Sequence, residues 1–356
     1  MRTMAGTAST GPVPVTVLTG ALGSGKTTLL RRLLTAETDA RIAVVINEFG
    51  EVGLDHLLVR NVTENAVVLQ NGCICCTIRS DLQASFRELI DGRASGAIEP
   101  FDRVVLETTG LADPAPIVQT LVADPLLRHH MRLAGIVCTA DALHARQQAE
   151  TQPEAMQQLA IADALVVTKT DMPGAPSFAE VRRTLARLNP IAEVTDANAP
   201  AFDVRRLLDD RRTSRSGAAQ DWLQRLSAQP DAHEAEHHGS HGHTGVASFV
   251  FRTDGHVDWT AFGVWLTAFA HRYGEQILRI KGLLNVPEAP GPIVLDVVRG
   301  VIHHPVHLES WPDPDRSSRI VFILQDLDCS RVANALRGFL ADAGSGSAGG
   351  DARACA

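Results

Sequence analysis

Short apolar runs alternate with helix-like stretches through the first 208 residues of the chain. The runs are almost continuously apolar, as strands buried on both faces are. They lie at Val15–Thr19, Ile42–Ile46, Val67–Leu69, Arg103–Leu106, Ala134–Val137 and Ala164–Val167. Helices between such strands cover both faces of a parallel sheet. The pattern therefore predicts a doubly wound, mostly parallel α/β domain over residues 15–208.

Two of the intervening helices carry local signals. Paired leucines four residues apart, at positions 29, 30, 33 and 34, predict one buried helix face. Asp113 followed by Pro114 predicts a helix start with Asp113 as the cap and proline in the first turn.

The composition changes after residue 208. Residues 209–245 are rich in Arg, Asp, Gln, Ser and Gly and predict an exposed linker, which contains His233, His237, His238, His241 and His243. Strands are then expected at Val246–Arg252, Gln276–Val286, Ile293–Val298 and Ile320–Leu324, with helices at Asp258–Arg272 and Ser330–Ala341. This order predicts a second, smaller α+β domain over residues 246–341, with disordered ends at 1–14 and 342–356.

Charge and hydropathy exclude several functional classes. The net charge is -8, with 33 Lys and Arg against 41 Asp and Glu, so the chain has no surplus of positive charge for nucleic acid. No uncharged apolar run reaches the roughly 18 residues of a membrane span, and residues 1–14 contain no secretory h-region. The sequence predicts a cytoplasmic protein that does not bind membranes.

The segment from Gly20 to Thr27 fits the phosphate-loop pattern G-x-x-x-x-G-K-[ST] and lies between a predicted strand and a predicted helix. Glycines let the backbone approach phosphate closely, Lys26 reaches the β and γ phosphates, and Thr27 is a ligand for Mg²⁺. The predicted nucleotide-binding residues here are Gly20, Gly23, Ser24, Gly25, Lys26, Thr27 and Thr28, with Lys26 also catalytic.

Thr168-Lys169-Thr170-Asp171 directly follows a predicted strand and is the candidate base-recognition loop. The Asp171 carboxylate can accept from both the ring N–H and the exocyclic amine of guanine, whereas adenine offers no such donor pair. GTP is therefore expected, with Lys169 and Asp171 as its base contacts. Thr168 stands where the usual motif has Asn, and we expect this loop to be held less firmly.

Acidic residues follow two other strands. Glu107 at a strand end is expected to hold Mg²⁺ through water, and the N–H of Gly110 is expected to contact the γ-phosphate. Glu48 and Glu51 follow the strand Ile42–Ile46, where either can bind Mg²⁺, position water or complete a metal site, or simply face solvent.

Three of the six cysteines, Cys73, Cys75 and Cys76, lie within four residues after a short apolar strand. In a reducing compartment this density favours binding of a metal such as Zn²⁺ over disulfides. Buried packing cysteines or a redox pair are the other interpretations. The fourth ligand is open among Glu51, water, a linker histidine and a partner protein. The linker histidines themselves either load metal or form a plain polar linker.

Taken in order, the phosphate loop, Asn47–Glu51, Asn71–Cys76, Glu107–Pro114 and Thr168–Asp171 resemble the CobW-type metallochaperone GTPases, the CobW/HypB/UreG group of SIMIBI-class P-loop GTPases. The resemblance implies GTP, Mg²⁺ and a transition metal as ligands and a client metalloprotein as partner. Relatives handle different metals, so Co²⁺ and Fe²⁺ are alternatives to zinc. It implies Lys26, Thr27 and Glu107 for GTP and Mg²⁺, and the three clustered cysteines with Glu51 for the metal. Some relatives have another acid at the position of Ile46, so a site that needs that carboxylate is in question here.

These features predict a GTP-hydrolysing metallochaperone in which Lys26, Glu48 and Glu107 are catalytic and GTP closes the cysteine segment around the metal. Two rivals come from other classes: a non-enzymatic zinc buffer and a small-molecule or nucleotide kinase. The client, the physiological metal, the oligomeric state (a homo-oligomer is compatible) and the water-activating residue are left open by the sequence.

Overall fold

The computed structural model describes residues 11–38, 40–47, 66–70, 78–211, 222–225, 245–287 and 289–346. The chain divides into two compact units, Met1–Ala186 with Ala192–Ala219, and Arg187–Ile191 with Gln220–Ala356. None of the described helices is both long enough and apolar enough to cross a membrane.

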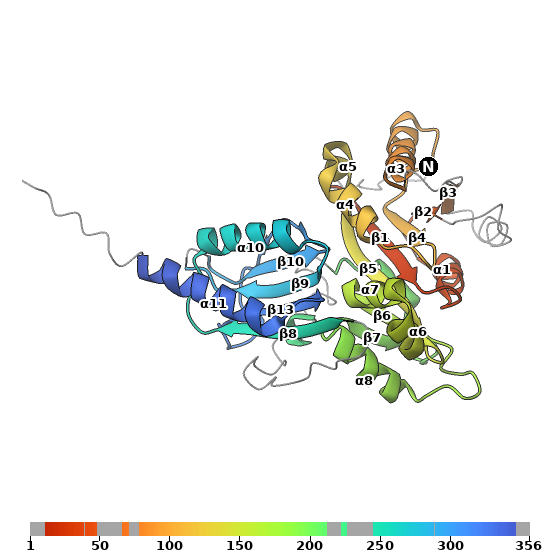
Figure 1. The fold of residues 1–356 in the computed structure, drawn as a ribbon. Coiled ribbons are helices and arrows are strands. Elements are labelled where there is room, and N and C mark those ends of the chain that lie inside the picture. The colour runs from red at the N-terminus through yellow and green to blue at the C-terminus, as the bar shows by residue number, and fades with distance from the viewer. Residues whose placement is uncertain are drawn as a thin grey trace, which may run out of the picture. The chain divides into compact units, whose positions relative to one another are not determined.

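The first unit contains a seven-stranded sheet in the order β3-β2-β4-β1-β5-β6-β7. All of its strand pairs are parallel. The strands are β1 (Val13–Gly20), β2 (Ile42–Asn47), β3 (Ala66–Gln70), β4 (Arg103–Thr108), β5 (Met131–Asp141), β6 (Ala164–Thr168) and β7 (Glu193–Asp196). The parallel α/β fold expected from the apolar runs is confirmed (Figure 1).

Helices connect these strands. They are α1 (Lys26–Thr35), α3 (Ile78–Ser95), α4 (Ala115–Ala123), α5 (Pro125–His130), α6 (Ala145–Thr151), α7 (Pro153–Ile161), α8 (Phe178–Leu188) and the 3-10 helix η1 (Val204–Leu208). The four paired leucines of α1 are buried, as their spacing predicts, and pack with β2 residues such as Val44 and with η1 residues such as Leu207. This packing fixes α1, and with it the loop that precedes it, against the sheet.

Several local predictions differ from the structure. Strand β1 begins at Val13 and helix α11 spans Cys329–Gly346, so each extends into a stretch expected to be disordered. Strand β5 spans Met131–Asp141, well beyond the expected Ala134–Val137. Strand β7 was not predicted, because its residues Glu-Val-Thr-Asp lack an apolar run, and Glu193 is buried through an ion pair with Arg211 (Nη1 to Oε2, 2.7 Å). Helix α4 begins at Ala115, so Asp113 lies one residue before the cap, although its Oδ1 accepts from the Ala115 N–H at 2.9 Å.

The second unit is built on a six-stranded antiparallel sheet in the order β11-β10-β9-β13-β8, with β12 paired to β10. Its elements are β8 (Val246–Thr253), α10 (Trp259–Tyr273), β9 (Ile277–Leu284), β10 (Ile293–Val298), β11 (Val301–Ile302), β12 (Val306–His307), β13 (Ser318–Gln325) and α11 (Cys329–Gly346). The predicted α+β order is confirmed.

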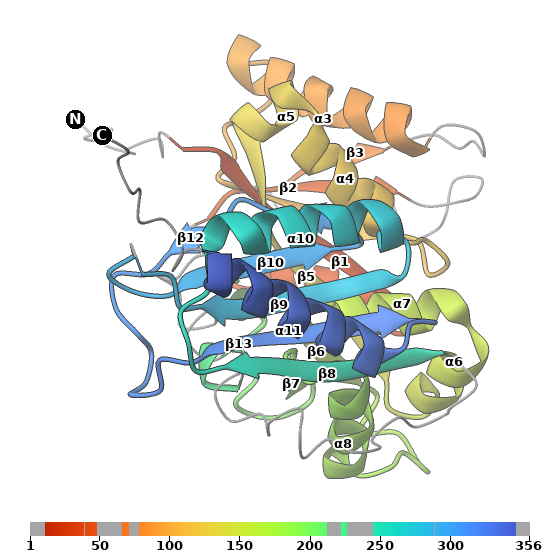
Figure 2. The ribbon, with the colours of Figure 1, turned by 60° about the vertical axis from the view of Figure 1, so that its left-hand side comes forward.

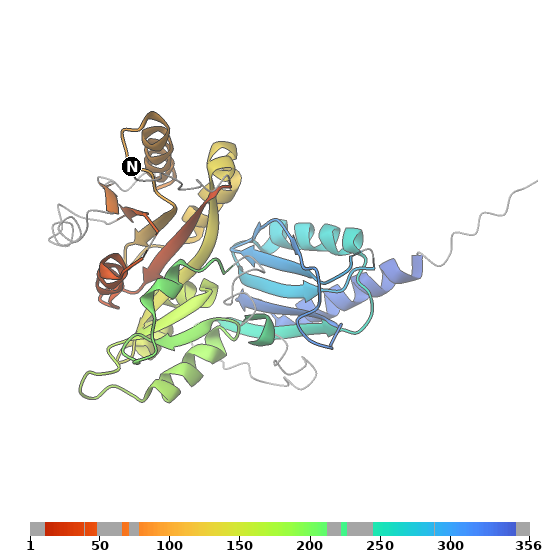
Figure 3. The same ribbon diagram turned by 180° about the vertical axis from the view of Figure 1, so that it is seen from behind.

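One face of this sheet is covered by helices α10 and α11 (Figure 2). Phe262 of α10 and Leu336 of α11 are fully buried in the core with strand residues, and the rings of Phe249 and Phe322 stack at 4.8 Å. Figure 3 shows the strands of the sheet from behind. This apolar core belongs to the second unit alone, which is consistent with a domain that has its own folding core.

Candidate nucleotide site

The carboxyl ends of the parallel strands gather the predicted nucleotide residues. The phosphate loop follows β1, Glu107 is the penultimate residue of β4, and the base-recognition loop follows β6. Because all these strands run in one direction, these segments share one edge of the sheet, where α/β proteins bind ligands.

The phosphate loop has the backbone that its glycines allow. Gly20 has φ 137° and Gly25 has φ 97°, both in the region that favours glycine. A Cβ at Gly20 would overlap the hydroxyl of Thr139. The Lys26 ammonium lies back over the loop, where it donates to the carbonyl oxygens of Gly20 (2.8 Å) and Ala21 (3.1 Å). The positive charge is therefore held at the concave side of the loop.

A cavity of about 400 Å³ opens at this loop, and its walls include Lys26, Thr27, Glu107 and Gly110. The Thr27 hydroxyl donates to Oε1 of Glu107 at 2.8 Å. A hydroxyl and a carboxylate are the hard oxygen ligands that Mg²⁺ prefers, so these two residues fit a magnesium ion beside the phosphates. Of the other predicted loop residues, Gly23, Gly25 and Thr28 also line the cavity, whereas Gly20 and Ser24 are not among its lining residues.

The turn after β4 lies directly against the phosphate loop. A Cβ at Gly110 would overlap the backbone N and Cα of Leu22, so only glycine permits this approach. Next to it, Thr109 lines the same cavity, and its buried hydroxyl has no hydrogen-bond partner among the described residues. The turn therefore contributes two residues, Thr109 and Gly110, to the wall of the cavity.

The base-recognition loop is joined to the phosphate loop through Thr168. Its buried hydroxyl donates to the Ser24 carbonyl at 2.7 Å. The threonine that stands where the usual motif has Asn thus links the two loops directly. The Ser24 hydroxyl in turn lies 2.6 Å from that of Thr139 on β5.

Lys169 and Asp171 are each oriented by a distant residue. Lys169, at a positive φ of 59°, donates its Nζ to Oδ2 of Asp141 at 2.6 Å. Asp171 is exposed, and its Oδ1 accepts from Nδ2 of Asn198 at 2.7 Å. The neighbouring Thr170 hydroxyl adds two further contacts to this loop: it donates to Oδ1 of Asp196 at 2.8 Å and accepts from Nδ2 of Asn198 at 3.1 Å.

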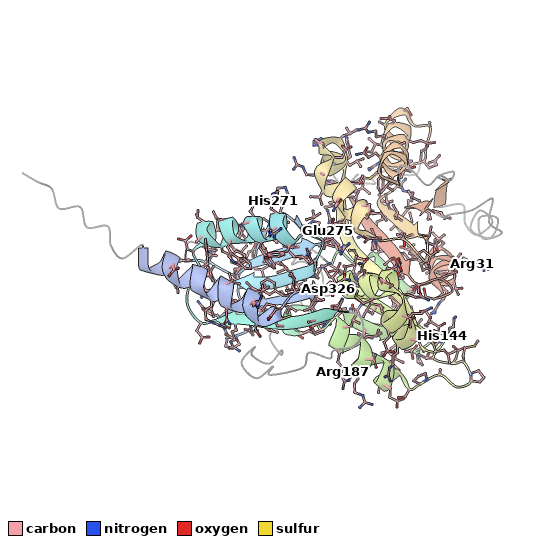
Figure 4. The ribbon with its side chains drawn as sticks, in the orientation of Figure 1. Arg31, His144, Arg187, His271, Glu275 and Asp326 are labelled. Atoms are coloured by element: carbon pink, nitrogen blue, oxygen red, sulfur yellow. The ribbon has the colours of Figure 1, made fainter. Side chains whose placement is uncertain are left out.

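Asp141 at the end of β5 carries a perturbed carboxyl. Burial raises its pKa, but hydrogen bonds from Lys169 and His144, with the charge of Lys169, lower the pKa below its ordinary value overall. The ring of His144, labelled in Figure 4, is half exposed and lies 3.1 Å from the same carboxylate oxygen. Asp141 is thus a carboxylate at neutral pH and attracts the Lys169 ammonium.

The predicted metal residues Cys73, Cys75, Cys76 and Glu51, and the predicted catalytic Glu48, lie outside the described residues, as do the linker histidines. In the described part of the chain, no cluster of three or more His, Cys, Asp or Glu could hold a metal ion. Burial raises the pKa of the Cys138 thiol to about 12 and that of Cys329 to about 11, so neither is a thiolate at neutral pH. These two cysteines are therefore poor metal ligands.

Four residues that orient the site were not predicted from the sequence. They contact Lys169, Asp171, Ser24 and the turn after β4, and they are Asp141, Asn198, Thr139 and Gln158 respectively. Only Asp141 carries a usable sequence signal, since it is an acid directly after an apolar strand, as Glu107 is. The others are polar residues on strand β5 (Thr139), on helix α7 (Gln158) and in the loop after β7 (Asn198), with no local pattern around them.

The geometry defines a P-loop nucleotide-binding protein. The family model "CobW/HypB/UreG, nucleotide-binding domain" matches residues 14–196, and "Cobalamin synthesis protein cobW C-terminal domain" matches residues 246–340. The chain therefore belongs to the CobW/HypB/UreG family and is a GTPase of that family.

Individual relatives cover most of the chain. It is 32% identical to the zinc chaperone YjiA of Escherichia coli, over 88% of this chain and 94% of that protein. It is 31% identical to the zinc chaperone CobW of Pseudomonas aeruginosa, over 92% of each. The crystal structure of Zn(II)-bound YjiA GTPase from E. coli is similar with a TM-score of 0.70 at 28% identity, over 92% of this chain and 99% of that one.

Proposed function

We propose that this GTPase binds a transition metal, zinc first, through Cys73, Cys75 and Cys76 and transfers it to a client metalloprotein, with GTP and Mg²⁺ controlling metal affinity. Two relatives that share about a third of their residues with the chain are zinc chaperones. The C-x-C-C pattern supplies the soft thiolates that zinc prefers over hard oxygen ligands.

Strand order is the observation that carries the proposed coupling. Strands β3, β2, β4 and β1 are consecutive neighbours in the sheet. The cysteine segment begins directly after β3, the Glu48 and Glu51 segment directly after β2, and the phosphate loop directly after β1. Three strand spacings separate β3 from β1, about 14 Å at roughly 4.8 Å each. All three segments start from one edge of the sheet within this distance.

The residues at the phosphate end of the site have distinct proposed roles in binding and hydrolysing GTP. Lys26 binds the β and γ phosphates, Thr27 and Glu107 hold Mg²⁺, and the Gly110 N–H contacts the γ-phosphate. Magnesium would neutralise charge that develops on the phosphates during hydrolysis. Ordering of loops by a γ-phosphate is a known switching device, and here the loops concerned include Glu48, Glu51 and the cysteines.

The coupling is tested by anaerobic competition titration of the protein with Zn²⁺, and in parallel with Co²⁺ and Fe²⁺. Each titration is carried out in three states: with Mg²⁺ and a non-hydrolysable GTP analogue, with GDP, and without nucleotide. We expect zinc to bind tightest with the GTP analogue, and zinc to tighten binding of that analogue by the same factor, because binding couplings are reciprocal. Equal zinc affinity in all three nucleotide states contradicts the coupling.

Cys75→Ala should lower zinc affinity about 100-fold or more, since it removes one of three thiolates, and should abolish the effect of zinc on GTP turnover. Cys329→Ala is the matched control, because the raised pKa of that thiol already makes it a poor ligand. A Cys75→Ala protein with unchanged zinc affinity rules out the proposed cysteine site. Zinc binding that persists without any effect on turnover supports the rival buffer function.

A further inference from the structure

The side chain of Gln158 on α7 lies beneath the turn that follows β4. It is fully buried, and its Nε2 donates to the carbonyl oxygens of Gly110 (3.3 Å) and Ala112 (2.9 Å). Both acceptors are carbonyls, which cannot donate, so the amide nitrogen must face the turn. One side chain, from a helix 48 residues away in sequence, thus holds two peptide groups of the turn.

The turn is held from its other side by the phosphate loop. Gly110 lies against the backbone of Leu22 so closely that no side chain fits between them. Within the turn, the Ala112 N–H donates to the Thr109 carbonyl at 3.2 Å. The Thr108 hydroxyl also donates to the Thr109 carbonyl, at 3.2 Å. The turn is therefore held by the phosphate loop, by bonds from neighbouring residues and by Gln158 of α7.

The Gln158 amide is not fully satisfied. Its Oε1 is buried and has no hydrogen-bond partner in the part of the chain that the structure describes. A buried polar atom without a partner destabilises the fold, and an apolar side chain of similar volume would avoid that cost. What an apolar side chain cannot provide is the pair of hydrogen bonds to the turn.

We propose that Gln158 is a positioning residue for GTP: it holds the turn of residues 109–112 so that the Gly110 N–H points toward the γ-phosphate. The inference rests on the proposed contact between Gly110 and the γ-phosphate. GDP has no γ-phosphate, so loss of the Gln158 contacts weakens the triphosphate and leaves the diphosphate unaffected. Gln158 touches neither nucleotide and acts only through the turn.

The test uses the full chain with Mg²⁺ and compares Gln158→Met with the matched control Gln147→Met, the same change at an exposed position of the neighbouring helix α6. Affinities for a non-hydrolysable GTP analogue and for GDP are measured, together with single-turnover GTP hydrolysis. For Gln158→Met we expect about tenfold weaker binding of the analogue, equivalent to about 1.4 kcal/mol, GDP affinity within about twofold, and slower hydrolysis. Gln147→Met should match the unaltered chain.

Equal weakening of both nucleotides in Gln158→Met indicates a purely structural role and overturns the proposal, as does an unchanged affinity for both. If Gln158→Met does not fold, as judged by circular dichroism, Gln158→Asn replaces it. Asn keeps the donor on a side chain one methylene shorter, and the same selective loss, smaller in size, is expected. Retention of full analogue affinity there overturns the proposal.

Gly110→Ala tests the γ-phosphate contact independently of Gln158, because its added methyl group displaces the turn from Leu22 directly. If Gly110→Ala binds the GTP analogue normally, the proposed γ-phosphate contact is wrong. If Gly110→Ala weakens the analogue while Gln158→Met does not, the γ-phosphate contact stands and only the role of Gln158 is wrong.

Discussion

At the phosphate end of the nucleotide site, ligand-facing groups are mostly main chain or buried side chains, whereas at the base end they are side chains on an exposed loop. Lys26 and Glu107 are buried, and the glycine backbone shapes the cavity around them. Asp171 is exposed and is oriented by Asn198, itself exposed. Buried charges act in a lower dielectric, so each group at the phosphate end should contribute more.

The largest effect is expected from Lys26→Met. The ammonium lies over the phosphate loop within reach of two carbonyls, and Lys26 is the only cation among the described residues that line the cavity. We expect kcat/KM for GTP to fall about 100- to 1000-fold, the range for a lost electrostatic stabiliser. This fall in kcat/KM is measured from the steady-state rate of phosphate release. Arg31→Met, an exposed cation on the same helix (Figure 4), should have almost no effect, and a comparable loss there would argue against a specific role for Lys26.

Asp171→Asn should have an intermediate effect. Asn cannot accept from both guanine donors, but its amide can donate to the extra carbonyl of xanthine. We expect GTP affinity to fall about 30-fold, less than for a fully buried hydrogen-bonding site, and affinity for xanthosine triphosphate to rise. Competition binding with both nucleotides measures the change. If GTP binds as before, the base does not contact this loop.

Asp141→Asn should have the smallest effect, about threefold weaker GTP binding, because the ion pair that it removes orients Lys169 without touching the nucleotide. The pKa of Asp141 lies below its ordinary value of 3.8, so the carboxylate stabilises the fold above pH 3.8 and loses that contribution as the pH falls through the folded-state pKa. Urea unfolding should therefore show a smaller gap between the unaltered chain and Asp141→Asn at pH 3 than at pH 7. A gap independent of pH contradicts this account.

The sequence predicted the central strands and the phosphate loop for a shared reason: their signals are local. Apolar runs identify buried strands, and residues 20–27 contain the whole loop motif in eight consecutive positions. Strand β7 lacks such a run, because Glu193 becomes buried only through its pairing with Arg211. The burial of Glu193 in β7 thus depends on Arg211 from another segment, and a local pattern in one sequence does not show such pairing.

Within the site, too, some residues have local sequence signals and others depend on contacts with distant segments. The pairs Lys169 with Asp141, Asp171 with Asn198, and Gly110 with Gln158 join residues 28, 27 and 48 positions apart. Asn198 and Gln158 have no local sequence signal, and Asp141, an acid after an apolar strand, meets Lys169 only through the order of the sheet. The candidate ligand residues could thus be predicted from motifs, while the partners that orient them required the fold.

The hydrogen bond from Thr168 to the Ser24 carbonyl makes the two halves of the nucleotide site one connected receptor. GTP is in this respect a bivalent ligand: once its triphosphate is bound, the guanine is presented to Asp171 at a high effective concentration. Guanosine and inorganic triphosphate, supplied as separate molecules, should together occupy the site far more weakly than the intact nucleotide. For GTP to dissociate, its triphosphate and its guanine must both be released before either one binds again.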